Sequence, residues 1–341
     1  MAALALFPNL AQISRPLPSF HSSTVRFPVL FVGSKNRFLV PRTTCRVPSV
    51  LPLLGVLSPS DQSSFQAEFL QLVLASPATW NSAIASNLLI FTVGSPLLLS
   101  GLSVKGMASA FLLGVLTWRA FGAPGFLLVA TYFIVGTAVT KLKIAQKEAL
   151  GVAEKGKGRR GPGSVIGSSA AGCICALLSL SGVGGSAFAG IWQLGFVASF
   201  CTKLADTVSS EIGKAYGKTA YLVTTLKAVP RGTEGAVSVE GTIAGLLASV
   251  LLASVGYFLG EIDASQIAIC VIASQIANLV ESFIGAAFQE KKGFQWLSND
   301  AVNVLNISIG SILAVLMQLL SAKIWLCCCS LDLASQLQGS D

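Results

Sequence analysis

Apolar stretches of near-membrane length dominate this chain. Each is close to the roughly 20 residues that an α-helix needs to cross a bilayer. The sequence is 53% hydrophobic and only 11% charged, whereas soluble domains are roughly one-quarter charged. It therefore predicts an all-α fold, a polytopic transmembrane helix bundle of six to eight spans. The stretches lie near residues 81–99, 106–121, 124–140, 164–181, 184–202, 241–260, 264–284 and 303–325.

The first 60 residues differ in composition from the rest. They hold six basic residues, many prolines and no acidic residue before Asp61. This pattern is typical of an organellar transit peptide, and the prolines oppose the amphipathic helix of mitochondrial presequences. A disordered tail would have the same composition. We expect residues 1–60 to be a plastid transit peptide, which places the mature protein in a chloroplast membrane.

The positive charge of the chain is concentrated in that segment. The formal net charge is +8: six basic residues precede residue 61, and 17 basic and 15 acidic residues lie from residue 61 onward. This near-balance gives no reason to expect nucleic acid as a partner. The only histidine, His21, also lies in the transit segment. The mature protein is therefore expected to have no histidine-based catalysis or metal ligation.

Three basic connections are expected on one side of the membrane. They lie at 141–163, at 203–240 and around Lys291, and pairs of spans separate them. The turn between the later spans carries Glu261 and Asp263 instead. Basic loops on one face follow the positive-inside pattern. In a plastid, that face is expected to be the stromal one.

A polar helix face continues directly from the fifth apolar stretch. If the helix continues at about 100° per residue, six polar residues fall within an arc of roughly 140°. A solvated helix end would also carry charge, but ionisable groups at membrane depth are costly and usually functional. The six residues are Lys203, Asp206, Thr207, Ser210, Glu211 and Lys214.

The segment 224–242 combines glycines, hydroxyl groups and both signs of charge. Glycines allow backbone N–H groups to approach an anion, and Lys227 and Arg231 offer positive charge to phosphate oxygens. Glu234 is a suitable Mg²⁺ ligand, because this ion prefers carboxylates together with phosphate oxygens. A polar turn that ends in a helix cap such as Ser238 is a compatible alternative.

Two later spans carry polar side chains on single faces. Asn299, Asn303 and Asn306 fall within an arc of roughly 60°, and Asn278 lies on a polar face of the preceding span. Interhelical hydrogen bonding explains such amides equally well. Glu281 is more informative, because a carboxylate within an apolar span requires a cation, a proton or a metal as its partner.

Together these motifs resemble the plastid phytyl-phosphate kinases of vitamin E biosynthesis, in a membrane family that includes the transmembrane protein 19 group. The resemblance covers about residues 80–326, followed by a short tail at 327–341. It implies phosphate transfer from a nucleoside triphosphate, CTP being one candidate, to phytyl phosphate. The product would be phytyl diphosphate for tocopherol synthesis, with phytol from chlorophyll breakdown. The matching segments are Ala205-Asp206-Thr207, Ser210-Glu211-Ile212-Gly213, 227–238, Gly241-Thr242, Glu281-Ser282 with Gly285, and Asn299 with Asn303.

An isoprenoid-monophosphate kinase is the working hypothesis for these residues. Phosphoryl transfer needs positioning and charge neutralisation, which they supply without histidine. Mg²⁺ is the expected cofactor, and a nucleoside triphosphate and an isoprenoid phosphate lipid are the expected substrates. Catalytic roles are assigned to Asp206, Glu211, Lys227 and Arg231. Substrate or phosphate contacts are assigned to Lys203, Ser210, Gly232, Thr233, Ser238, Thr242, Asn278 and Asn303. The expected Mg²⁺ ligands are Asp206, Glu211, Glu234 and Glu281.

A transporter or flippase for a phosphorylated lipid or small anion is the main alternative. Polar faces on several spans and a Gly/Pro-interrupted segment also describe a substrate pathway. A transporter should hold the charged cluster near the bilayer midplane and have paired broken helices. A kinase should keep the cluster at one surface, open to soluble nucleotide. A scaffold subunit would need no converging carboxylates.

Overall fold

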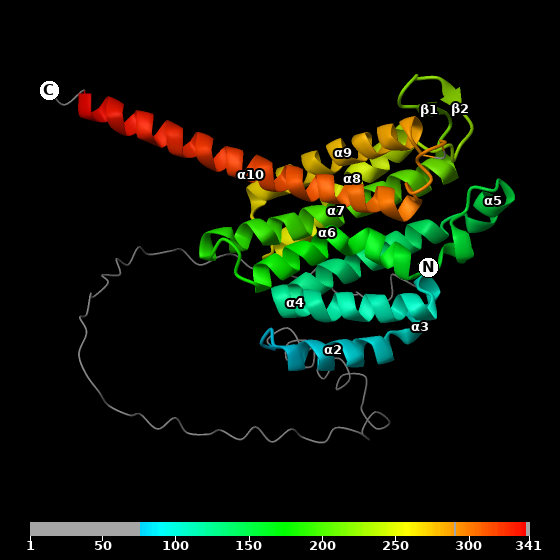
Figure 1. The fold of residues 1–341 in the computed structure, drawn as a ribbon, viewed down its shortest axis with the longest axis horizontal. Helices are drawn as coiled ribbons and strands as arrows, with labels where there is room; N and C mark the ends of the chain where they lie inside the picture. Colours follow the sequence, from blue (N-terminus) through cyan, green and yellow to red (C-terminus); the bar gives the residue numbers. More distant parts are fainter. Residues whose placement is uncertain (1–75, 290, 339–341) are drawn as a thin grey trace, which may run out of the picture. The chain divides into compact units, whose positions relative to one another are not determined.

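The structure is a bundle of long helices with one small sheet. A computed structural model describes residues 76–289 and 291–338 (Figure 1). The expected transit segment 1–60 lies outside the described residues. The helices are Trp80–Val93 (α2), Ser95–Gly101 (α3), Val104–Lys141 (α4), Ile144–Ala149 (α5), Pro162–Leu180 (α6), Ser186–Tyr216 (α7), Val239–Phe258 (α8), Ala264–Ala287 (α9) and Asn299–Gln338 (α10), with a 3₁₀-helix at Lys155–Gly158 (η2).

Membrane-length helices make up most of the bundle, which confirms the expected all-α class. Among the described residues, six helices are long and apolar enough to cross a membrane. A seventh span is formed if α2 and α3, which are bent by 80° at the break between them, count as one. α10 runs on to Gln338, so helix continues through most of the segment expected to be a tail.

α4 is a helical hairpin. Gly122 interrupts it with a φ of 69° and a ψ of −163°. The backbone oxygen of Arg160 accepts a hydrogen bond from Ser103 N (3.0 Å), and its guanidinium donates one to Tyr132 (2.6 Å). In one straight helix Ser103 and Tyr132 would lie roughly 40 Å apart at 1.5 Å per residue. One arginine could not form hydrogen bonds with both residues over that distance. The two halves of α4 therefore run antiparallel (Figure 1). They add one membrane crossing, as the separate apolar stretches 106–121 and 124–140 predict.

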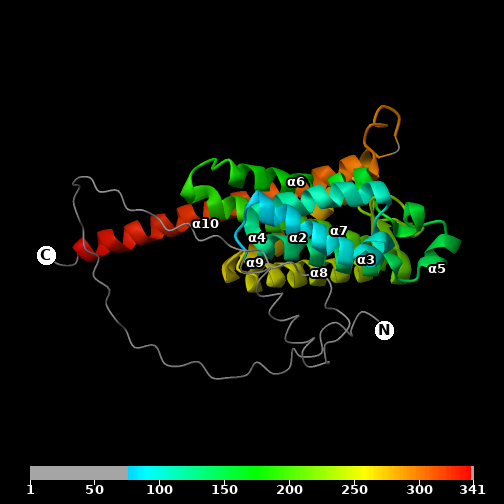
Figure 2. The same ribbon diagram turned by 90° about the horizontal axis from the view of Figure 1, so that it is seen from below.

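α7 is the central helix of the bundle. It contacts α4, α6, α8, α9 and α10, and Figures 1 and 2 show these helices around it. Its middle turns bury Phe196, Phe200 and Leu204 completely. Two glycines let neighbours approach closely: a Cβ at Gly245 of α8 would lie 2.8 Å from the Ala205 oxygen, and one at Gly310 of α10 would lie 2.1 Å from Thr202 Oγ1. Such close packing is typical of membrane helices.

A three-stranded antiparallel sheet follows α7, which the sequence did not lead us to expect. Its strands are Ala220–Leu222 (β1), Ala228–Val229 (β2) and Ala236–Val237 (β3), in the order β2-β1-β3. Ala220 pairs with Val229, and Tyr221 pairs with both Ala228 and Val237. Figure 1 places this sheet, α5 and the α9–α10 connection at the same end of the bundle. We call this end the basic end.

The α8–α9 turn lies at the opposite end and contains a buried carboxylate. Glu261 is only 5% exposed, and Gln193 Nε2 donates a hydrogen bond to its Oε2 (2.7 Å). Burial raises the pKa of Glu261 from 4.5 to about 7, although the Gln193 hydrogen bond acts in the opposite direction. The folded protein therefore holds this proton more tightly than the unfolded chain does.

This shift predicts a pH-dependent stability. The contribution of Glu261 is fully present below pH 4.5 and is lost as the pH rises through about 7. The free energy of unfolding should therefore fall by an amount on the order of 3 kcal/mol across this window. Thermal unfolding of Glu261→Gln in detergent should lack this fall, whereas Asp263→Asn, at an exposed carboxylate two residues away, should retain it. An unchanged pH profile in Glu261→Gln would contradict the assignment.

Candidate active site

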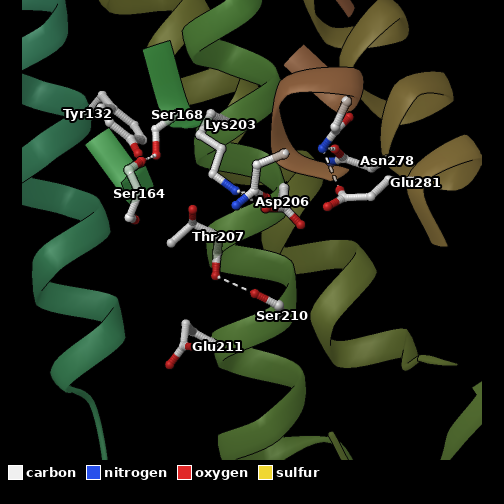
Figure 3. Close-up of polar contacts among 12 residues, drawn as sticks. Tyr132, Ser164, Ser168, Lys203, Asp206, Thr207, Ser210, Glu211, Asn278 and Glu281 are labelled. Atoms are coloured by element: carbon white, nitrogen blue, oxygen red, sulfur yellow. Dashed lines mark hydrogen bonds and ion pairs between the residues drawn. The ribbon is translucent and has the colours of Figure 1, made fainter. Parts of the chain in front are cut away.

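Continuation of α7 beyond the membrane-length stretch creates the site. The helix runs without interruption to Tyr216. The polar residues from Lys203 to Lys214 therefore all lie on one helix, as the predicted polar face requires. Lys203 and Asp206 lie on this continuation, side by side (Figure 3). The Lys203 Nζ lies 2.5 Å from Asp206 Oδ2 and donates a second hydrogen bond to Asn303 Oδ1 of α10 (2.6 Å). Lys203 therefore joins the two helices at this level.

Side chains from α9 and α10 complete the cluster. Asn306 Nδ2 donates to Asn278 Oδ1 (3.0 Å) and also to Glu281. Glu281 in turn interacts electrostatically with Asp206 and Lys203, and Figure 3 shows it on the α9 side of Asp206. Residues distant in sequence thus converge at one point between α7, α9 and α10, which we call the carboxylate cluster: Lys203, Asp206, Asn278, Glu281, Asn303 and Asn306.

The carboxylate cluster has more carboxyl groups than cations. Among the described residues, the charged groups that act on Glu281 are the carboxylates of Asp206 and Glu234 and one cation, Lys203. Asn306 is completely buried, and its Oδ1 has no hydrogen-bond partner among the described residues. Two adjacent carboxyl groups that share one cation, and an unpaired acceptor oxygen, are unfavourable in a buried site. Oxygen donors that include two carboxyl groups fit a hard cation such as Mg²⁺.

Glu211 is not part of this cluster. It is 2% exposed, and it forms ion pairs with Lys147 of α5 and, at 3.3 Å, with Lys214. Lys147 is itself completely buried and also donates to the Thr140 backbone oxygen (2.7 Å). The arc of roughly 140° on α7 therefore faces two different environments. The described residues contain no group of three or more acidic, cysteine or histidine side chains placed to hold a metal together. The four expected Mg²⁺ ligands are accordingly not gathered at one point.

Gly235 allows the turn at 230–235 to pack against α9, beside the carboxylate cluster. A Cβ on Gly235 would lie 2.3 Å from the Ala286 nitrogen and 2.4 Å from the Ser282 oxygen, so the turn packs directly on the α9 backbone. Gly235 also has a φ of 72°, a conformation that L-residues rarely adopt. This contact brings Glu234 within electrostatic range of Glu281. The turn is thus held against the side of the carboxylate cluster.

Substitution of Gly235 by alanine should separate this turn from α9. We expect a large loss of activity together with a loss of stability of about 1–3 kcal/mol from the forced backbone. Gly260→Ala is the matched control, because Gly260 has a φ of 76° but no atom within 4 Å of an added Cβ. Activity assays and thermal unfolding of both variants separate the effects. Equal activity in the two variants would show that the turn has no part in the site.

Four of the remaining assigned residues make local hydrogen bonds. Ser238 caps α8 by accepting from Gly241 N (3.1 Å), so the capping alternative is correct for it. Thr242 donates to the Ser238 oxygen, Thr233 to the Pro230 oxygen and Ser210 to the Thr207 oxygen. Their substrate roles stay predictions. Lys227, Arg231 and Gly232 lie on the connections of the sheet, where Lys227 and Gly232 are exposed and Arg231 is half-buried.

Sequence reasoning did not assign three residues that border this region. Lys147 lies in the basic connection 141–163, and nothing in the sequence indicates that it pairs with Glu211. Tyr132 of the α4 hairpin accepts a hydrogen bond from Arg160 (2.6 Å) and acts electrostatically on Lys203. No local pattern could identify Lys147 or Tyr132, because the role of each depends on a contact with a residue distant in sequence. Asn306, the third residue, does belong to the helix face of Asn299 and Asn303, but no feature of the sequence was a reason to assign it a binding role.

Known proteins resemble the chain over most of its length. It is 67% identical over 258 residues to "Protein VTE6, chloroplastic" of Arabidopsis thaliana, which covers 76% of this chain and 78% of that protein. It is 44% identical to an uncharacterized membrane protein of Synechocystis, over 74% of this chain and 96% of that one. An uncharacterized membrane protein of Methanocaldococcus jannaschii is 31% identical, over 62% and 84%.

No solved structure matches the chain. A family model, integral membrane protein DUF92, matches residues 87–311. This range includes every member of the carboxylate cluster. The chain therefore belongs to the integral membrane protein family DUF92.

Proposed function

We propose that this protein is a phytyl-phosphate kinase with a role in tocopherol synthesis. It transfers the γ-phosphate of a nucleoside triphosphate to an isoprenoid monophosphate, phytyl phosphate, and forms phytyl diphosphate. Two kinds of support agree. The segments around Asp206, Pro230, Glu281 and Asn303 resemble those of the plastid phytyl-phosphate kinases, and the chain is 67% identical to a protein named VTE6, chloroplastic.

The carboxylate cluster is the observation that carries the proposal. Asp206 and Glu281 place two carboxylates beside one lysine, and Asn306 adds an unpaired amide oxygen. Mg²⁺ is usually bound by one or two carboxylates together with substrate phosphate oxygens. Asp206 and Glu281 are thus the residues that would hold it, with Asn306 as a further oxygen donor. When bound, the ion neutralises charge on the phosphate oxygens.

Lys203 has the central place in the proposed reaction. An oxygen of the phytyl phosphate monoester attacks the γ-phosphorus, the bond from that phosphorus to the β–γ bridging oxygen breaks, and a nucleoside diphosphate leaves. The acceptor oxygen is already ionised at neutral pH, because the second pKa of a phosphate monoester is near 6, so no strong general base is needed. Lys203 is held by Asp206 and Asn303, and its positive charge stabilises the charge on the transferred group.

The depth of the cluster favours a kinase over a transporter. Asn303 lies four residues from the start of α10, and Glu281 lies six residues from the end of α9. At 1.5 Å per residue these positions are roughly 6 and 9 Å from the helix ends, at the basic end. The Asp206 side chain retains 19% exposure. A cluster near one surface suits a soluble nucleotide and a lipid acceptor, whereas a transporter site is expected near the midplane.

The proposed location is a chloroplast membrane, in which the protein is multi-pass. The composition of residues 1–60 and the chloroplastic relative both support this location. The basic end, with α5, the sheet and the α9–α10 connection, would face the stroma under the positive-inside pattern. The nucleotide would then bind from the stroma, and the isoprenoid chain would lie in the bilayer beside the apolar helix surfaces.

Direct reconstitution tests the proposal. The full chain in nanodiscs is incubated with phytyl phosphate, Mg²⁺ and each of ATP, CTP, GTP and UTP labelled at the γ-phosphate. Labelled phytyl diphosphate is the expected product, with at least one donor. Transbilayer movement of phytyl phosphate is measured in parallel without nucleotide. Movement without any labelled product from any donor would favour the transporter and overturn the kinase proposal.

A further inference from the structure

A second group of positive charges lines a cleft outside the carboxylate cluster. The cleft lies at the basic end, has a volume of about 470 Å³ and is bordered by Ser100, Lys141, Gly156 and Arg159. These residues come from α3, the last turn of α4 and the segment of η2. Gly156 has a φ of 66° and no atom within 4 Å of an added Cβ, so its side of the cleft is open.

The two cations of this cleft have no acidic partner among the described residues. Neither Lys141 nor Arg159 forms an ion pair within the described part of the chain. Arg159 is exposed and Lys141 is half-buried. A lysine in the last turn of a helix is stabilised by the helix dipole without any ligand. That explanation accounts for Lys141 alone and not for Arg159 across the same cleft.

The surroundings of the cleft favour a lipid over a soluble anion. It lies where the membrane-length helix α4 ends, at the level at which lipid headgroups meet water. Exposed apolar residues neighbour its lining in the sequence: Leu99 precedes Ser100, and Leu142 follows Lys141. Basic pockets between membrane helices with apolar surface beneath them are suited to anionic headgroups.

We propose that this cleft binds the phosphate-bearing headgroup of an anionic membrane lipid. Lys141 and Arg159 contact the phosphate oxygens, the Ser100 hydroxyl lies at the rim, and the acyl chains follow the exposed surfaces of α3 and α4. This site is separate from the carboxylate cluster and does not depend on the proposed kinase reaction.

Native mass spectrometry of the purified full chain tests the proposal with phosphatidylglycerol as the probe. The double variant Lys141→Ala/Arg159→Ala should bind one lipid about 30-fold more weakly than the unmodified protein, since each cation near a membrane surface contributes about 1 kcal/mol. The matched control is Lys291→Ala/Lys292→Ala, which removes two exposed cations from the α9–α10 connection at the same end. Its lipid binding should be unchanged.

Further arms separate the possible outcomes. Lys141→Gln/Arg159→Gln removes the same charges with longer side chains, so the result does not depend on the folding of one variant. Inorganic phosphate is titrated into protein in neutral phosphatidylcholine nanodiscs. The proposal is overturned if both cleft variants retain phosphatidylglycerol. It is also overturned if inorganic phosphate binds the cleft as tightly as the lipid does, because the cleft would then be a site for soluble anions.

Discussion

Asp206→Asn is expected to reduce phytyl diphosphate formation by at least about 100-fold while the protein stays folded. Asparagine keeps the shape of the side chain and its oxygen acceptor for Lys203, which lies 2.5 Å from Asp206. It removes one negative charge from the carboxylate cluster. If Asp206 helps to hold Mg²⁺, the Mg²⁺ concentration for half-maximal activity should also rise. Glu281→Gln should act in the same direction, because Glu281 is the other carboxylate of the pair.

Stability should respond in the opposite sense to activity. Lys203 is the one cation that acts on Glu281 among the described residues, so removal of one carboxyl group relieves the unfavourable interaction between Asp206 and Glu281 in a buried site. The thermal midpoint of Asp206→Asn without Mg²⁺ should therefore equal or exceed that of the unmodified protein. Glu240→Gln is the control, since Glu240 lies in the first turn of α8 at the same end. Full turnover by Asp206→Asn at every Mg²⁺ concentration would remove the cluster from the mechanism.

Lys147→Ala is expected to cause the largest loss of stability, about 3 kcal/mol. Lys147 is completely buried against Glu211, which is 2% exposed. Without Lys147, the Glu211 carboxylate keeps a single ion pair among the described residues, with Lys214 at 3.3 Å. Removal of one partner from a buried ion pair leaves the other charge poorly compensated. Lys147→Met/Glu211→Leu should recover most of the loss, because both charges are absent. Lys218→Ala, at an exposed lysine of the same end, should change the midpoint little.

The activity of the Glu211 variants decides between two roles for this residue. A residue that only anchors α5 to α7 should leave turnover per folded molecule and its Mg²⁺ dependence nearly unchanged in Glu211→Gln. A metal ligand should alter the Mg²⁺ dependence. A folded Glu211→Gln protein with altered Mg²⁺ dependence would restore the catalytic assignment made from the helix face. Thermal unfolding measured alongside the rate distinguishes the two.

The helical periodicity identified Lys203, Asp206 and Glu211 as one polar face, and the structure divides that face. Periodicity gives the angle of a side chain around its own helix, which is a local property. It does not tell which helix lies opposite each angle. α9 and α10 lie beside Asp206, whereas α5 lies beside Glu211. The separation therefore depends on packing between segments more than 60 residues apart.

The sequence by itself determined the membrane class, the apolar spans, the basic connections and the position of Glu281 within an apolar span. These follow from local properties: apolar length, charge position and the cost of an ionisable group in an apolar span. Only the tertiary structure decided that Asp206 and Glu281 meet, that α4 folds back at Gly122 and that Lys147 is buried. Glycines at helix contacts and the hairpin bring distant turns together. Such contacts depend on how whole helices pack, which no single segment specifies.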